Sequence, residues 1–268
     1  MNTAQLALNP ASEAATFGRL PLQPLHAFRS LRKLIANKED TVQVFEIIKA
    51  LSGKSIYNGY QKMLSLPEGA RQAYLRPEMA EKLSDDAWLA SFAPGTVGAC
   101  YREFIGLRAL SADGLVDESR KASDASDVDS AHPVAWYARR IRDIHDIWHV
   151  LTGYRTDTLG EACLLAFTHG QVKNRGIAFI VMAASFEMTR SHRHQPYTSA
   201  MLQGWRNGKA AKWLPAEDYD ALFAEPLEAA RKRLNIAVPT IYERVPMEAR
   251  NAYRESEDRE LRIAGKAA

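Results

Sequence analysis

The chain has 268 residues, of which 46% are hydrophobic, and this content is sufficient for one large core or two small ones. Its formal net charge is +3, from 35 basic and 32 acidic residues, so the overall charge gives no reason to expect a nucleic-acid partner. The two cysteines, Cys100 and Cys163, do not form a CxxC pair, which argues against a disulfide scaffold and a cysteine-based zinc finger. A reducing compartment is therefore expected.

The first twenty residues are rich in Ala, Asn and Ser and show no hydrophobic period. Residues 1–20 are therefore predicted to form a flexible N-terminal arm. The segment has no basic region before Arg19 and no long apolar core, so it lacks the pattern of a secretory or organelle-targeting signal. A cytoplasmic location is expected.

The first predicted helix covers residues 25–38, where the apolar side chains recur at the spacing of one helix face. Basic side chains lie beside that face at Arg29, Arg32 and Lys33. This pattern makes the helix a candidate for contact with a membrane surface, and an ordinary solvated basic face is the alternative.

A second helix is predicted over residues 40–53, with Asp40 as its N-cap, Gln43 as the capping-box partner of Asp40, and Gly53 at its end. Prolines and glycines break the chain between residues 64 and 92, where short helical turns are expected.

The next predicted segments are a glycine-rich turn that leads into a helix at residues 94–110 and a polar, exposed connection at 111–133. Further helices are predicted at 133–151, ending at Gly153, and over the ranges 158–173, 176–190, 199–207 and 227–234. The charged segment 241–268 is predicted to be a frayed tail.

The longest apolar run, GIAFIVMAA at residues 176–184, is too short to cross a bilayer, which needs about 20 residues. It is interpreted as a fully buried core helix; the alternative is a helix that lines an apolar ligand tunnel or touches a membrane. Since no pair of strands with a hairpin turn is visible, the predicted fold is all-α, with residues 21–240 forming a single-domain multi-helix bundle.

The segment HDIWHVLTGYRTDTLGE contains the residues that point most directly to chemistry. On a helix with about 100° per residue, His145 and His149 project within about 40° of each other, so both imidazoles can face one ion, with Asp146 close by. A turn at Gly153 followed by an antiparallel helix would bring Glu161 to the same point. Two histidines and two carboxylates suit zinc, magnesium, manganese or iron.

Simpler structural roles compete with this metal site. Thr158 and Glu161 have the spacing of a capping box, and Asp146 could pair with a neighbouring arginine. Arg139 and Arg142 share the face of His145 and could form a cationic patch for an anionic substrate group. Alternatively, they are solvated side chains that pair with nearby aspartates.

The spacing from His145 to Glu161 resembles the HDxxH-x11-E signature of the Coq-four family of ubiquinone-biosynthesis proteins. PGTVGACYREF at residues 94–104 is similar to that family's proline- and glycine-rich stretch, and residues 204–236 resemble its C-terminal Trp-x2-G-x3-K segment and its final Arg-x-x-Leu-x-Ile. Asp218 and Tyr219 depart from the family pattern, which usually has a tryptophan followed by an acidic residue.

The resemblance implies an all-helical protein with an apolar cavity for a polyprenyl chain. It also implies a catalytic divalent metal ion, most often zinc, held by His145, Asp146, His149 and Glu161. The implied reaction is decarboxylation at C1, oxidative or not, of a 4-hydroxy-3-methoxy-5-polyprenylbenzoate. The alternative is a non-catalytic prenyl-lipid-binding scaffold that organises the quinone biosynthetic complex.

In this interpretation, Arg139 and Arg142 would bind the acid of the substrate, and Phe179 and Met182 on the apolar helix would contact its polyprenyl tail. The expected partners are a prenylated aromatic substrate or polyprenyl lipid, other quinone-biosynthesis proteins and a second copy of the chain, but no nucleic acid. Contact with the membrane would be peripheral, at the inner membrane if the protein is bacterial.

Overall fold

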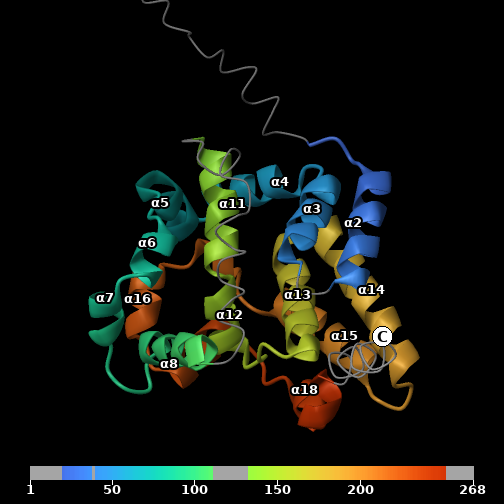
Figure 1. Ribbon diagram of the computed structural model, residues 1–268. Coiled ribbons are helices and arrows are strands. Elements are labelled where there is room, and N and C mark those ends of the chain that lie inside the picture. Colours follow the sequence, from blue (N-terminus) through green and yellow to red (C-terminus); the bar gives the residue numbers. More distant parts are fainter. Residues whose placement is uncertain (1–19, 38–39, 111–131, 252–268) are drawn as a thin grey trace, which may run out of the picture.

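The computed structural model describes residues 20–37, 40–110 and 132–251. Within these residues every regular secondary-structure element is a helix, which confirms the predicted all-α fold (Figure 1). The predicted N-terminal arm, the predicted connection at 111–131 and the tail beyond residue 251 lie outside the described residues.

The first two helices are α2 (Pro24–Ala36) and α3 (Thr41–Leu51), as predicted. The predicted capping box is wrong, because the Asp40 side chain accepts no backbone N–H. Gln43 instead donates its side-chain amide to the Asp40 carboxylate at 3.2 Å. The end of α3 agrees with the prediction, since Gly53 follows it with a φ of 55°, in the left-handed region that favours glycine.

The next part of the chain forms five helices, of which the first was not predicted. They are α4 (Ser55–Leu64), α5 (Pro67–Leu75), α6 (Met79–Leu83), α7 (Asp86–Ala90) and α8 (Val97–Leu110). The start of α8 is tied to the C-terminal half, because the backbone N–H of Val97 donates to the carbonyl of Glu225 at 2.9 Å.

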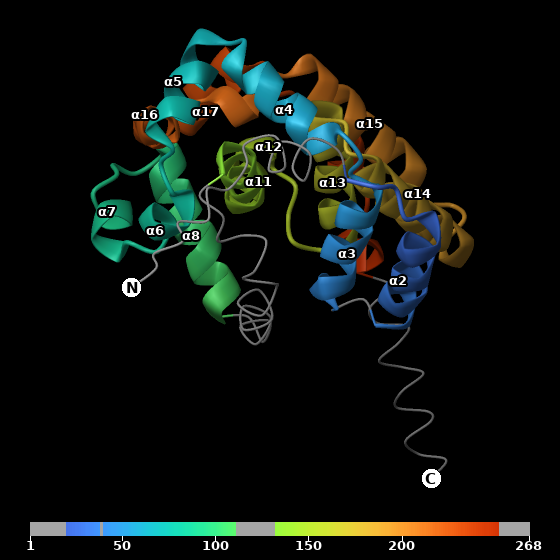
Figure 2. The same cartoon turned by 90° about the horizontal axis from the view of Figure 1, so that it is seen from above.

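The helix predicted over residues 133–151 is divided into α11 (Pro133–Asp143) and α12 (His145–Thr152), with Ile144 at the junction. α12 ends at Gly153, whose φ of 79° reverses the chain as predicted. Seen from above, α11 and α12 lie between α8 on one side and α3 on the other (Figure 2).

Three long helices follow, α13 (Thr158–Val172), α14 (Arg175–Ser191) and α15 (Tyr197–Ala210). Glycines allow α13 and α15 to approach closely: a Cβ at Gly208 would lie 2.2 Å from the carbonyl oxygen of Phe167. Gly204 is equally constrained, with 2.6 Å to the carbonyl oxygen of Cys163. The glycines of the GWRNGK segment are therefore explained by helix packing.

The C-terminal elements are a 3₁₀ turn at Leu214–Ala216 and three short helices, α16 (Tyr219–Ala224), α17 (Leu227–Leu234) and α18 (Thr240–Arg244). The prediction of a frayed tail is wrong for residues 241–251, which are largely helical. Tyr242 and Val245 are each 1% exposed, and Tyr197 donates its hydroxyl to the carbonyl of Ala249 at 2.7 Å. Apolar burial holds this part of the tail in place.

The main core contains buried side chains from Met79 to Val245, so most of the described chain shares one hydrophobic centre. A second cluster joins α2, α3 and α14 through Ala27, Leu31, Ile47, Ala50 and Ile180. In the main core, Trp148 donates its indole N–H to the hydroxyl of Tyr219 at 2.8 Å, which gives Tyr219, one of the two departures from the family pattern, a defined structural role.

The interpretation of residues 176–184 as a fully buried core helix is wrong. Ile177 and Ile180 are buried, but on the opposite face of α14 Met182 is 63% exposed, and Phe186, one turn beyond the run, is 66% exposed. None of the described helices combines the length and the hydrophobicity that crossing a membrane requires.

Candidate metal centre

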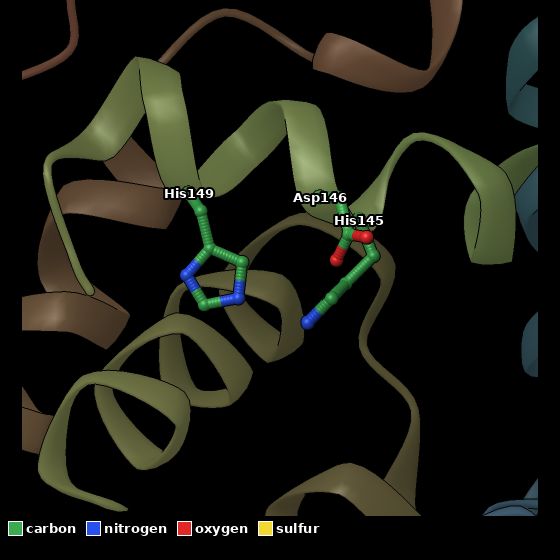
Figure 3. A group of neighbouring side chains, drawn as sticks. All are labelled: His145, Asp146 and His149. Carbon is green, nitrogen blue, oxygen red and sulfur yellow. The ribbon is translucent and has the colours of Figure 1, made fainter. Parts of the chain in front are cut away.

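The two histidines of the HDxxH motif extend from the same side of α12 (Figure 3). Their ring centroids are 5.2 Å apart and the rings are perpendicular. The His149 side chain is completely buried, whereas that of His145 is 25% exposed. Ligand atoms of His145, Asp146 and His149 all lie within 4.8 Å of one another, which is a distance compatible with one shared ion.

Glu161 reaches the histidines from the first turn of α13. One carboxylate oxygen lies 3.3 Å from Nε2 of His149, and the other lies 3.6 Å from Nε2 of His145. The capping-box alternative is wrong, because Asp157 is the N-cap of α13 and accepts the N–H of Gly160 at 2.8 Å. The Glu161 side chain is therefore directed to the imidazoles.

The orientation of the His149 ring fits a metal ligand. Its Nδ1 lies 2.9 Å from the backbone carbonyl of Tyr154, an acceptor, so Nδ1 carries the proton and Nε2 keeps its lone pair in the neutral ring. Nε2 is buried and has no hydrogen-bond partner. A buried nitrogen of this kind is costly to leave unsatisfied, and a metal ion bound beside Glu161 would satisfy it.

Phe104 of α8 is a further residue of the site, and its ring stacks on that of His149 with centroids 5.4 Å apart. The sequence analysis did not identify it as a site residue, although it ends the PGTVGACYREF stretch. The only signal was that resemblance, because no local pattern indicates that α8 packs against α12.

Glu161 and His149 alter each other's proton affinity. Burial alone would raise the pKa of Glu161, but the charge of His149 and the nearby imidazole of His145 outweigh this effect and hold that pKa well below its usual value. Burial likewise opposes a charged His149, yet the Glu161 carboxylate raises the pKa of this histidine above its usual value. In the metal-free chain, the two groups therefore favour an ion pair.

The two arginines predicted to bind the substrate acid both have carboxylate partners. Arg139 forms a salt bridge with Glu78 at 2.6 Å, and its side chain is only 16% exposed. Arg142 pairs with the adjacent Asp143 at 2.8 Å. The Arg142 contact agrees with the alternative of solvated arginines that pair with nearby aspartates, whereas Arg139 is mostly buried and pairs with a glutamate distant in sequence. Neither contact supports a free cationic patch.

The two apolar residues predicted to contact a polyprenyl tail lie in different environments. Met182 lines an open groove of about 1020 Å³ between α13, α14 and α15, together with Phe186, Leu202 and Trp205. None of His145, His149 and Glu161 lines this groove. Phe179 instead packs against the second cluster, which also includes Leu165, one helical turn after Glu161 on α13.

Residues of the C-terminal segment also support the site, and the sequence analysis did not identify them. The Tyr242 hydroxyl donates to the carboxylate of Asp157, the N-cap of α13, and the Arg250 guanidinium lies 4.2 Å from the centre of the Tyr242 ring. These contacts hold the first turn of α13, which carries Glu161. The charged composition of the tail concealed this role.

The fold and the site together define a class: an all-helical protein in which two histidines and a glutamate from successive helices converge at one point suited to a divalent metal ion. The family model described as "Coenzyme Q (ubiquinone) biosynthesis protein Coq4" matches residues 13–240. The chain therefore belongs to the Coq4 family of ubiquinone-biosynthesis proteins, which confirms the resemblance noted in the sequence.

Curated relatives agree with this assignment. The mitochondrial ubiquinone-biosynthesis COQ4 homologues of Nematostella vectensis and Bos taurus are each 29% identical to the chain, over 181 and 178 residues. Both alignments cover 65% of the chain, and they cover 82% of the Nematostella protein and 63% of the bovine protein. The chain thus matches less than two thirds of the length of the bovine relative.

A solved structure is similar in fold. The crystal structure of a Nostoc punctiforme protein named for ubiquinone biosynthesis superimposes with a TM-score of 0.55 and 20% sequence identity. The superposition covers 80% of this chain and 99% of the Nostoc chain. At this identity the comparison shows a shared fold, and the chemistry must be argued from the site itself.

Proposed function

We propose that the chain is a metal-dependent decarboxylase of ubiquinone biosynthesis that removes the C1 carboxyl group of a 4-hydroxy-3-methoxy-5-polyprenylbenzoate. The observation that carries the proposal is the buried, unsatisfied Nε2 of His149, which faces Glu161 at 3.3 Å. His145 and Asp146 complete a donor set of nitrogen and oxygen atoms that suits zinc, and also suits magnesium, manganese or iron.

The proposed chemistry breaks the bond between ring carbon C1 and the carboxyl carbon. Carbon dioxide leaves, and C1 receives a proton in a simple decarboxylation or an oxygen atom from an added oxidant in an oxidative one. A divalent ion held by His145, Asp146, His149 and Glu161 would supply a positive charge for the substrate carboxylate or phenolate. The chain's own residues fix the position of that charge, because Tyr154 orients His149 and Asp157 orients the first turn of α13.

Apolar side chains that follow Glu161 along α13 and pack beside it fit the polyprenyl part of the substrate. Leu165 follows Glu161 on α13, and it shares the second cluster with Phe179 and Ile48, which are all only partly buried. A substrate with its polar ring at the metal centre and its tail on this cluster would match both surfaces. Phe179 keeps its proposed role in tail binding under this arrangement.

The first test measures metal content. We expect the wild-type protein to bind close to one equivalent of zinc, iron, manganese or magnesium by plasma mass spectrometry, and we expect His149→Ala and Glu161→Gln to lose it. Circular dichroism checks that the variants are folded, and His169→Ala is a matched control because His169 bonds to the carbonyl of Asn174 outside this group. Decarboxylation of a short-chain prenylated hydroxybenzoate is then assayed with the same set.

Either of two results would refute the proposal. In one, folded wild-type protein binds none of these metals after they are added back. In the other, the metal-loaded wild type and the His149→Ala variant release carbon dioxide at the same rate.

A second candidate function is a non-catalytic prenyl-lipid-binding scaffold for other quinone-biosynthesis proteins. It is favoured by the groove beside Met182, which is apolar and is not lined by His145, His149 or Glu161. A scaffold would retain bound prenyl lipid in the His149→Ala variant and lose it in Met182→Glu. An enzyme would also keep its lipid in His149→Ala, but it alone has a turnover, which that variant would lose.

A further inference from the structure

Helix α2 exposes large apolar side chains on its outer face. Leu25 is 75% exposed, Phe28 is 54% exposed and Ile35 is 38% exposed. At about 100° per residue these three side chains fall within an arc of about 80°. The neighbouring face of α2 is buried against α3 through Ala27 and Leu31. The apolar outer face therefore is not needed to hold the helix in place.

Three cations accompany this apolar arc: at about 100° per residue Arg32 falls within it, and Arg29 and Lys33 follow on the side away from Ala27 and Leu31. Arg29, Arg32 and Lys33 are exposed, and none of them has an acidic partner among the described residues. Among the described residues, α2 forms an ion pair through His26, which lies 2.7 Å from Glu46 of α3. The exposed surface of α2 thus combines apolar side chains with cations, and Arg32 stands between Leu25 and Phe28.

We propose that α2 is the element through which the protein docks on a membrane, with Leu25, Phe28 and Ile35 entering the headgroup region of an anionic lipid bilayer. A helix that lies in the interface plane needs an apolar face to bury, and flanking cations that attract anionic lipids. α2 has both, at the edge of the molecule and without acidic side chains of its own (Figures 1 and 2). The inference stands apart from the proposed decarboxylase activity.

The charge test compares two variants with the same change in net charge. The first replaces the α2 cations, as Arg29→Gln, Arg32→Gln and Lys33→Gln; the control replaces the exposed cations Arg206, Lys232 and Arg244 with Gln. Binding is measured by sedimentation with vesicles of phosphatidylcholine, with and without phosphatidylglycerol. Since each cation near an anionic surface contributes about a fivefold factor, the α2 variant should bind anionic vesicles roughly a hundredfold more weakly. The control should stay close to wild type.

The apolar test uses Phe28→Ser, with Tyr74→Ser as the control, because Tyr74 is 85% exposed on α5. Loss of a buried aromatic side chain should weaken vesicle binding about tenfold or more, and the control should not. A polarity-sensitive fluorophore attached at Leu25→Cys should shift to shorter emission wavelength when anionic vesicles are added. The same label at Tyr74→Cys should not shift.

The proposal is overturned if the full-length protein does not bind anionic vesicles, or if the α2 variants bind them as well as wild type. The second result would arise if another face contacts lipid, or if α2 recognises a protein instead. The His149→Ala variant should bind vesicles like wild type, so a failure of the metal proposal and a failure of this one remain distinguishable.

Discussion

At the scale of single residues, His149 shows how burial and hydrogen bonding fix the orientation of a proposed metal ligand. The Tyr154 carbonyl fixes the proton on Nδ1, the ring of Phe104 covers one face, and Nε2 is left toward Glu161. A solvated histidine would exchange tautomers freely and would meet water in place of a carboxylate. The arrangement is therefore the one that the proposed metal ion would require at Nε2.

The titration of this pair gives a testable pH dependence. The pKa of His149 is raised in the folded state. The contribution of His149 to stability is therefore fully present below its pKa in the unfolded state, about 6.5, and is lost as the pH rises through its pKa in the folded state. The lowered pKa of Glu161 acts in the other direction: its contribution is present above about pH 4.3 and is lost only as the pH falls through the depressed value. The pair stabilises the metal-free chain most between these limits.

We therefore expect the stability advantage of metal-free wild type over Glu161→Gln to be smaller at about pH 8 than at about pH 6, because His149 loses its proton as the pH rises. Thermal unfolding in the presence of a chelator measures this difference. Metal affinity should move in the opposite direction and increase with pH, because binding must displace the proton of the imidazole. If wild type and Glu161→Gln differ in unfolding temperature by the same amount at the two pH values, His149 and Glu161 are not coupled.

At the scale of elements, the contact of α13 with α15 fixes where Glu161 lies. Gly204 and Gly208 let the two helices approach until backbone meets backbone, and α13 is thereby held between α15 and α14. The start of α13 is set separately, by Asp157 as its N-cap. The direction in which Glu161 projects depends on both contacts.

A substitution at the helix contact should show its importance. Gly208→Ala places a methyl group against the Phe167 carbonyl and should destabilise the fold by about 1–3 kcal/mol, because the contact atom is backbone and cannot turn aside. Gly106→Ala is the matched control: it is in a helix with no atom within 4 Å of the added Cβ, and it should stabilise by about 0.5–1 kcal/mol. Urea denaturation measures both changes. Equal effects would contradict the close approach of α13 and α15.

At the scale of the whole molecule, the C-terminal segment closes the structure around the site. Tyr242 is buried in the main core, contacts Asp157 through its hydroxyl and stacks edge-to-face on Tyr154, whose carbonyl orients His149. One residue near the end of the described chain therefore supports both helices that carry the histidines and the glutamate.

We predict that Tyr242→Ala will destabilise the protein by about 3–5 kcal/mol through loss of a large buried side chain. Metal affinity should also fall, although no ligand is changed, because both α12 and α13 lose support. Calorimetry and a competitive zinc titration test the two effects. The control Tyr74→Ala removes a tyrosine that is 85% exposed and should change stability by less than about 0.5 kcal/mol. Unchanged zinc affinity in folded Tyr242→Ala would refute the supporting role.

The sequence by itself determined the helical class, most helix positions and the residues of the HDxxH motif, because hydrophobic period, capping residues and the i, i+4 spacing are local properties of the chain. Only the tertiary structure decided that Glu161 faces the histidines, since its local pattern fitted a capping box equally well. It also decided that Arg139 pairs with Glu78, that Phe104 covers His149, and that residues 241–251 belong to the core. These contacts join segments distant in sequence, and no local pattern of side chains can specify which of them meet.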